Sequence, residues 1–230
     1  MLFKSGVIAS ASGSFGGMTV SRGRSGMYMR NRSIPVNPAS GAQVSVRAIF
    51  GNLSARWSTL TAAQRTAWET YAGNVPVINK LGDQIFLTGQ QMYVRCNATR
   101  QVTGLAVVDN GPTAMTGATL SATTASVSAT GNTISVTFET TDPWVDEDDA
   151  ALAVYISTDK GVGVNYHRGP YRLAGKIDGD SSTPPTSPDA TLTSPFTHTV
   201  GNNTFFRFVA VRADGRISAV QFRGPVGVTA

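Results

Sequence analysis

The sequence has few of the residues on which redox, metal-dependent and membrane proteins depend. Its 230 residues include one cysteine, Cys96, and two histidines, His167 and His198. A single cysteine excludes an intrachain disulfide, and we interpret Cys96 as a small apolar residue on a helix face. No apolar run approaches the roughly 20 residues of a membrane-spanning helix. The stretch after Lys4 is too short for the core of a signal peptide, so we expect a soluble protein made in a cytoplasm, with no membrane partner.

Charged residues are also scarce. They make up 14% of the chain, against roughly 25% in ordinary soluble proteins, and serine, threonine, glycine and alanine take their place. Hydrophobic residues still amount to 41%, which is enough for packed cores. A surface with few charges and many small polar groups suits a protein whose outside is largely covered by partners.

The common sequence signatures of catalysis are absent. The chain has no Gly-x-x-x-x-Gly-Lys-Ser/Thr loop, no Gly-x-Ser-x-Gly elbow, no His-Glu-x-x-His pair and no Cys-x-x-Cys pair. A serine-type triad needs His167 or His198 beside a serine and an aspartate, but these residue types are so abundant that proximity alone carries little information. We therefore expect no enzymatic activity, no cofactor and no bound metal.

The two halves of the chain carry opposite net charges. Residues 1–104 hold eleven of the nineteen lysines and arginines and only two acidic residues, for a net charge of +9. Residues 105–230 hold the remaining bases and twelve acidic residues, for a net charge of −4. A split of this kind indicates a partner for the basic half, either nucleic acid or the acidic half of a neighbouring copy.

Residues 1–38 form a glycine-rich basic segment. Strand-like triplets flank the turn at Arg22–Ser25, which predicts a short hairpin or an extended arm. Such a segment buries too little apolar area to order itself, so we expect it to become fixed on a partner. The side chains expected to contact neighbouring subunits are Arg22, Arg24, Tyr28, Arg30 and Arg32. In the alternative, nucleic-acid binding, the arginines contact phosphates and Tyr28 stacks on a base.

Residues 39–104 are predicted to form a small helical domain. The apolar spacing of Val46, Phe50, Leu53 and Trp57 predicts the first helix. The patterns Thr61-Ala-Ala-Gln64 and Thr88-Gly-Gln-Gln91 predict capping boxes at the starts of the next two helices.

The helical domain is expected to have one aromatic core. Trp57, Trp68 and Tyr71 form this core in our prediction, together with Met92 of the third helix. Gly73 is expected to end the second helix in a left-handed conformation. A turn with a short strand pair is expected in the connection over residues 75–87.

Residues 105–118 are rich in Gly, Pro, Thr and Ala and are predicted to be a linker. From residue 119 the apolar period changes to two, as at Ile134, Val136 and Phe138. About seven short strands over residues 119–230 predict an all-β immunoglobulin-like or fibronectin-like sandwich. Asp214-Gly215 predicts a type I′ hairpin turn before a last strand at residues 216–223. The expected fold class is therefore α+β multidomain.

One acidic cluster lies between two predicted strands, and it consists of Asp142, Asp146, Glu147, Asp148 and Asp149. Calcium binding is one interpretation, but the cluster lacks the ligand spacing of an EF-hand loop. A solvated connection is the second interpretation. The third is a contact with the basic segment of another copy, since complementary charges set the register between subunits; for this contact we select residues 146–149.

The run Leu60-Thr-Ala-Ala-Gln-Arg-Thr-Ala-Trp-Glu-Thr-Tyr-Ala72, with Trp57 before it and Thr88-Gly89 after it, resembles small bacteriophage and prophage proteins. In these proteins a glycine-rich basic start, a Leu-Thr-x-x-Gln-Arg-x-x-Trp helix and a β-sandwich follow in that order. The resemblance covers residues 13–104 at the level of motifs. It implies a structural role in the virion and no catalytic residues.

The leading hypothesis is a bacteriophage virion protein that decorates the capsid or belongs to the tail or neck. Its expected partners are other virion proteins and copies of itself, and its expected location is the virion. One alternative is a nucleic-acid-binding packaging accessory that uses the basic half. The other is a carbohydrate-binding adhesin in which Trp144, Tyr155 and Tyr166 stack on sugars.

Overall fold

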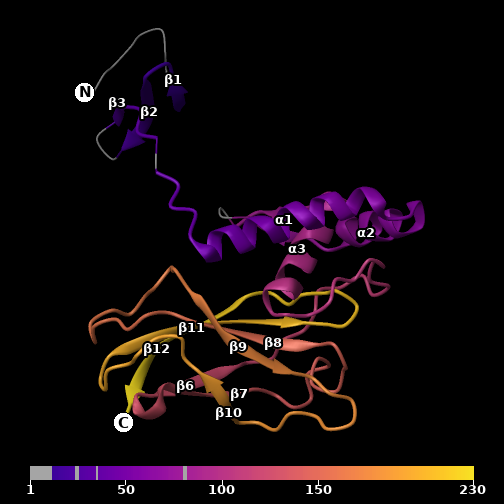
Figure 1. The fold of residues 1–230 in the computed structure, drawn as a ribbon, viewed down its shortest axis with the longest axis vertical. Helices are drawn as coiled ribbons and strands as arrows, with labels where there is room; N and C mark the ends of the chain where they lie inside the picture. The colour runs from indigo at the N-terminus through magenta and orange to yellow at the C-terminus, as the bar shows by residue number, and fades with distance from the viewer. Residues whose placement is uncertain (1–11, 24–25, 35, 80–81) are drawn as a thin grey trace. The chain divides into compact units, whose positions relative to one another are not determined.

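The chain divides into two compact units, Met1–Val44 and Ser45–Ala230. A computed structural model describes residues 12–23, 26–34, 36–79 and 82–230 (Figure 1). The fold is α+β, with three helices, a seven-stranded sheet and two smaller sheets among the described residues. No helix in this part of the chain is both long and apolar enough to cross a lipid bilayer.

The first unit contains an antiparallel three-stranded sheet in the order β1-β2-β3. Its strands are β1 (Gly13–Phe15), β2 (Met18–Gly23) and β3 (Gly26–Asn31). Strands β2 and β3 pair from Met18↔Asn31 to Gly23↔Gly26, so the predicted hairpin is present. Not one described side chain between residues 12 and 44 is buried. The described part of this unit therefore has a sheet but no buried core.

Three helices follow, α1 (Gly41–Thr59), α2 (Ala62–Asn74) and α3 (Gly89–Val102). Both predicted capping boxes are confirmed. In the first, the backbone N–H of Gln64 donates to Thr61 Oγ1 at 3.3 Å, and the N–H of Thr61 donates to Gln64 Oε1 at 3.0 Å. The predicted stop at Gly73 is wrong, because the helix continues to Asn74 and ends where the N–H of Val75 bonds the carbonyl of Tyr71. The connection to α3 contains the expected strand pair, β4 (Val77–Ile78) and β5 (Gln84–Ile85).

The helices enclose a core of aromatic rings. Trp68 and Tyr93 are fully buried, with ring centroids 5.5 Å apart, and Tyr71 packs edge-on against Trp68 at 6.0 Å. Trp57 lies at the margin of this core, half-buried against Tyr93. Cys96 is also buried there, and its burial raises the pKa of the thiol to about 12. The cysteine is thus a protonated, apolar member of the core.

The apolar stripe predicted on α1 covers this core only in part. Leu53 is 1% exposed, but Val46 and Phe50 are 42% and 47% exposed. Only the second half of the helix packs on its neighbours, so the sequence spacing predicted the helix correctly and overstated its contact surface.

The large sheet has the strand order β10-β7-β6-β12-β11-β8-β9. Its strands are β6 (Thr124–Ser128), β7 (Thr133–Thr137), β8 (Ala151–Ile156), β9 (Arg172–Asp178), β10 (Asp189–Thr193), β11 (Asn203–Val211) and β12 (Gln221–Thr229). A short 3-10 turn, Thr130–Asn132, joins β6 and β7. All seven strands contribute to one apolar core, in which Ile134, Val154, Phe206 and Phe208 are completely buried.

Strand β8 is buried on both faces. Leu152, Val154 and Ile156 face the large core, whereas Ala151 and Ala153 pack with Leu105 and strand β11 on the other face. In a strand with one buried face these two alanines would face solvent. Here their small side chains leave room for the segment that follows α3.

The end of the sheet differs from the sequence prediction in two ways. The last strand is Gln221–Thr229, not residues 216–223. The turn before it is not type I′, because only Gly215 has a positive φ, of 91°, whereas type I′ also requires one at Asp214. The N–H of Gly215 bonds the carbonyl of Arg212 at 3.1 Å, which gives a wider loop that ends in a left-handed glycine.

The segment at residues 105–110, predicted as part of a linker, is held by side chains of all three helices. Asp109 Oδ1 and Oδ2 accept two bonds of 2.7 Å from Arg56 of α1, and its carbonyl accepts the indole N–H of Trp68 at 2.9 Å. Asn97 of α3 bonds both the N–H and the carbonyl of Val108, at 2.8 and 3.0 Å. The arginine lowers the pKa of the Asp109 carboxyl, so this pairing persists at neutral pH.

Arg100 fastens α3 to the sheet. Its side chain is among the fully buried ones, and it donates to the carbonyls of Ala106, Asp149 and Arg212 at 2.7, 3.2 and 2.5 Å. Asp149 and Arg212 lie at the ends of strands β8 and β11, so one guanidinium serves three separate segments. The helices and the large sheet therefore belong to a single body.

We predict that Arg100→Met lowers the free energy of unfolding by about 3 kcal/mol, because three carbonyls lose their donor in a site closed to water. Urea unfolding followed by tryptophan fluorescence measures the change. Arg65→Met on α2 is the control and should stay within about 0.5 kcal/mol of the parent. Equal stability of the Arg100 and Arg65 variants would contradict the role of Arg100 in holding α3 to the sheet.

Candidate functional site

The three-stranded sheet has one polar and one apolar face. The pairs Ser21↔Tyr28 and Thr19↔Arg30 share one face, because side chains directly opposite each other point the same way. The pairs Val20↔Met29 and Phe15↔Met18 lie on the other face. Phe15 is 82% exposed and Met18 is 42% exposed. We call this second face the apolar face of the N-terminal sheet.

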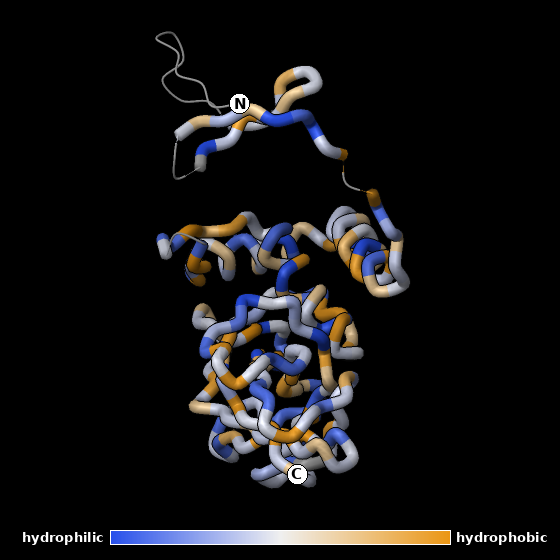
Figure 2. Tube along the Cα trace, turned by 90° about the vertical axis from the view of Figure 1, so that its left-hand side faces the viewer, coloured by the Kyte–Doolittle hydropathy of each residue, from blue (hydrophilic) through white to orange (hydrophobic). Residues whose placement is uncertain are grey.

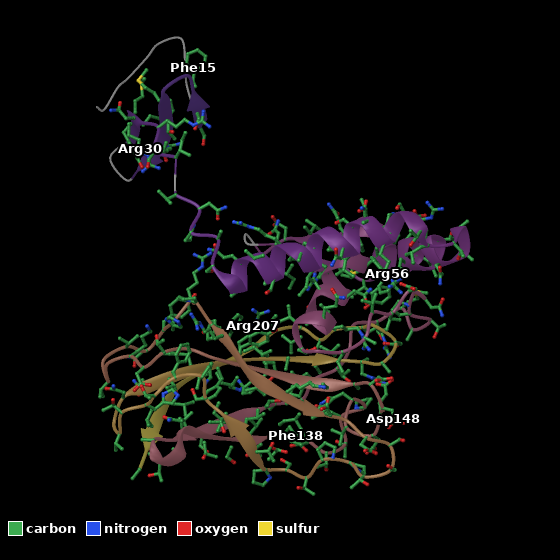
Figure 3. The ribbon with its side chains drawn as sticks, in the orientation of Figure 1. Phe15, Arg30, Arg56, Phe138, Asp148 and Arg207 are labelled. Carbon is green, nitrogen blue, oxygen red and sulfur yellow. The ribbon has the colours of Figure 1, made fainter. Side chains whose placement is uncertain are left out.

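The basic residues predicted for subunit contact lie around this sheet. Arg30, labelled in Figure 3, is exposed on the polar face, and Arg22 is exposed on β2 on the same face as Val20. Tyr28 is half-buried. The backbone N–H of Arg32 bonds the carbonyl of Gly17 at 2.8 Å, while its side chain is exposed. Arg24 lies outside the described residues.

The acidic cluster lies in the connection between β7 and β8, and part of it serves the fold. Asp142 is buried and accepts from the N–H and hydroxyl of Ser121 at 2.8 and 2.6 Å. Glu147 pairs with Arg212. Asp148 accepts from the N–H and hydroxyl of Ser181 at 2.8 and 3.1 Å.

Three side chains of the cluster face water. Asp146, Asp148 and Asp149 are exposed, and Figure 3 shows Asp148 on a loop at the margin of the sheet. Asp149 has a φ of 59°, and its carbonyl accepts from Arg100. Among the described residues no three His, Cys, Asp or Glu side chains are grouped so as to hold a metal ion.

A cleft lies beside strand β12 and the β8–β9 connection. Its volume is about 410 Å³, and the aromatic residues that line it are Tyr166, His167, Tyr171, Phe205 and Phe222. The rings of Tyr166 and Phe222 are 77% and 58% exposed. We call this feature the aromatic cleft.

The inner rings of the aromatic cleft support one another. His167 lies between Tyr171 and Phe205, with ring centroids 5.3 and 5.6 Å away, and Tyr171 contacts Phe222 at 5.9 Å. The Tyr171 hydroxyl donates to the carbonyl of His167 at 2.8 Å and closes the loop on itself. The cleft is therefore shaped before any ligand arrives.

Gly224 lets the backbone of β12 approach the cleft. Its φ is 146°, and a Cβ atom there would come within 2.4 Å of the Phe205 ring. Any larger residue would displace that ring, so the glycine is required by both its backbone conformation and the close approach.

Two of the three residues suggested for sugar stacking do not line this cleft. Trp144 is completely buried beside Phe138, with ring centroids 5.0 Å apart. Tyr155 lies under the guanidinium of Arg207, 4.9 Å from the ring centroid. Only Tyr166 lines the cleft. Its loop, Tyr166-His-Arg-Gly-Pro-Tyr171, is dense in rings and was the signal that sequence reasoning left unused.

Ser194, His198 and Asp159 form a hydrogen-bonded chain. His198 Nε2 lies 2.6 Å from Ser194 Oγ, and His198 Nδ1 contacts an Asp159 oxygen. The order matches that of a catalytic triad, which sequence reasoning had set aside for lack of information. However, the His198 side chain is 0% exposed, Ser194 is 8% exposed, and Ser194 Oγ also accepts the N–H of Phe196 at 3.1 Å.

The chain of hydrogen bonds holds the loop between β10 and β11 in place. The N–H of Thr199 donates to Asp159 at 2.7 Å, and the N–H of His198 donates to Asn132 Oδ1 at 3.0 Å. Burial by itself raises the pKa of the Asp159 carboxyl, but the bonds from His198, Thr199 and Asn202 together lower it. The Asp159 carboxylate therefore stabilises the fold at pH values above the ordinary aspartate pKa. This stabilisation is lost as the pH falls through the lowered pKa that Asp159 has in the folded state.

Comparison with known proteins adds nothing to these observations, since no family model, curated protein or solved structure matches the chain.

We predict that Ser194→Ala lowers the free energy of unfolding by about 1 kcal/mol, as expected for the loss of a buried hydrogen-bonding hydroxyl. Urea unfolding measures this change. In parallel, the parent protein and the variant are assayed with a p-nitrophenyl ester, and neither should release nitrophenol above the rate of buffer. Turnover by the parent that the variant lacks would instead assign the chain to catalysis.

Proposed function

We propose that this protein is a structural component of a bacteriophage virion, either decorating the capsid or built into the tail or neck. In this proposal it works by assembly, and its N-terminal sheet docks on a neighbouring copy or another virion protein. The observation that carries the proposal is the apolar face of the N-terminal sheet, where Phe15 is 82% exposed and no described residue between 12 and 44 is buried.

The physical argument starts from the size of the sheet. Three short strands need a packed hydrophobic face to be stable, because fixing each residue costs about 1–2 kcal/mol of backbone conformational entropy. No described residue between 12 and 44 is buried. Covering Phe15, Met18 and Val20 with a partner would supply the missing apolar burial. Figure 2 shows hydrophobic residues interspersed with hydrophilic ones along this sheet.

The distribution of charged residues favours another copy of the chain as the partner. Arg22 is exposed on the same face of β2 as Met18 and Val20, while Asp146 and Asp149 are exposed on the opposite-charged half of the chain. A contact between these two surfaces on different copies is heterologous, because it joins unlike patches. Repeated contacts of this kind build rings or lattices, which is how virion parts are assembled.

We further propose that the large sheet is a fibronectin-like sandwich, which would suit a compact domain on the particle surface. The seven strands separate into two groups, β10-β7-β6 and β9-β8-β11-β12, and both groups contribute to one core. Strand β12 joins them, because its earlier residues pair with β11 and Val228 and Thr229 run parallel to β6. This arrangement supports the sandwich.

Deleting residues 1–38 should leave a folded, soluble remainder that no longer enters particles, because the compact second unit starts at Ser45 and holds the cores of helices and sheet. Circular dichroism and urea unfolding test folding, and mass spectrometry of purified particles from a complementation experiment tests incorporation. Full incorporation of the truncated chain would refute the assembly role of the N-terminal sheet.

Charge exchange tests whether the partner is another copy. Arg22→Glu and Asp146→Lys should each weaken self-association by roughly tenfold, as expected for a close charge pair across an interface. A mixture of the two variants should associate more tightly than either variant alone, because the introduced carboxylate of one variant then meets the introduced ammonium group of the other. Sedimentation velocity at low and high salt measures the association. If the mixture behaves as the average of its parts, these charges do not meet between copies.

A further inference from the structure

We propose that the aromatic cleft binds an acidic saccharide, with a pyranose ring stacked on Tyr166 and its carboxylate held by Arg168 beside Arg223. This inference does not depend on the assembly role of the N-terminal sheet. It concerns a cleft built entirely from the second unit.

The exposed rings are the first argument. Large aromatic side chains usually bury most of their surface, yet Tyr166 is 77% exposed and Phe222 is 58% exposed beside a formed cleft. The face of an aromatic ring carries partial negative charge, and it attracts the C–H groups on the apolar face of a pyranose. Two such rings at one opening suit a flat, amphipathic ligand.

The size of the cleft is the second argument. About 410 Å³ lies within the range of small-molecule sites, and it accommodates one or two sugar rings. The inner rings are held by mutual contacts and by the bond from the Tyr171 hydroxyl to the carbonyl of His167. A rigid floor reduces the entropy lost on binding.

The charge of the lining is the third argument. Arg168 and Arg223 line the cleft together with Asn165, and no carboxylate does. Arg223 uses its Nε atom to bond the carbonyl of Thr123 at 2.8 Å, which aligns the side chain without neutralising it. Arg168 is exposed and has no ion pair with a described residue. Both guanidiniums thus retain their charge for a ligand carboxylate, which they can bind through paired hydrogen bonds.

The same charges disfavour nucleic acid. Residues 45–230 hold fourteen basic and fourteen acidic residues, for a net charge of zero, so the two arginines form a small positive patch on a neutral body. A long polyanion gains no attraction from such a body beyond the patch, and its binding depends on many cations. A ligand with a single carboxylate needs only the positive potential of the two arginines.

Titration by saturation-transfer difference NMR, with the full chain, tests this proposal. The probes are methyl glucuronide and methyl glucoside, which differ only in having a carboxylate or a hydroxymethyl group at C6. We expect saturation of the ring C–H protons of both probes and roughly tenfold tighter binding of the glucuronide, because a charge-assisted pair is added. The dissociation constant should lie below about 10 mM.

Three variants separate the contributions. Tyr166→Ala should reduce binding of both probes by at least about fivefold, since it removes the stacking ring. Arg168→Ala should remove much of the preference for the glucuronide, whereas Arg168→Lys should keep part of it because the charge remains. Phe86→Ala is the control, because Phe86 is also exposed, at 61%, but lies outside the cleft.

The proposal is overturned if neither probe binds at about 10 mM, if Tyr166→Ala binds like the parent, or if a single-stranded oligonucleotide displaces the glucuronide at micromolar concentration. The last result would assign the cleft to a nucleic acid. Each of these outcomes leaves the test of particle incorporation unaffected, so failure of one proposal is distinguishable from failure of the other.

Discussion

The buried guanidinium of Arg100 is the contact on which the second unit depends. It ties α3 to the carbonyls of Ala106, Asp149 and Arg212, and so to the segment after the helix and to the ends of strands β8 and β11. A helical cluster this small has little surface to bury by itself. Fastened to the sheet through Arg100, and to the segment after α3 through the Arg56–Asp109 pair, it becomes part of a larger folded body.

The first unit presents the opposite situation. It has regular strand pairing but no buried side chain among its described residues. Backbone hydrogen bonds alone add little net stability, because the unfolded chain makes equivalent bonds to water. In the proposed assembly, the second unit folds around its own two cores, and the sheet of the first unit is completed by contacts with a neighbour.

Local patterns in the sequence predicted local structure well. The capping boxes at Thr61 and Thr88, the hairpin around residues 18–31 and most strands of the large sheet follow from periodicity and turn chemistry. Long-range features were not predictable in this way. The burial of Arg100, the second packed face of β8 at Ala151 and Ala153, and the shift of the last strand depend on which segments meet in space.

The candidate sites show the same limit. Sequence reasoning found Tyr166 because it is aromatic, but it also selected Trp144, which is completely buried. Phe205 and Phe222 join Tyr166 only because β11 and β12 pair side by side next to the β8–β9 connection. Likewise the acidic cluster was predicted as one patch, whereas Asp142 and Glu147 are used inside the fold and Asp146 is left exposed.

The central claim is that the N-terminal sheet becomes stable only when a neighbour covers its apolar face. Amide hydrogen exchange of residues 12–34, compared between the dilute chain and assembled particles, tests this claim most directly. The account predicts fast exchange of these amides in the dilute chain and strong protection in particles, while the strands of the large sheet are protected in both. Equal, strong protection of the N-terminal amides in a chain that sediments as a monomer at every concentration would contradict it.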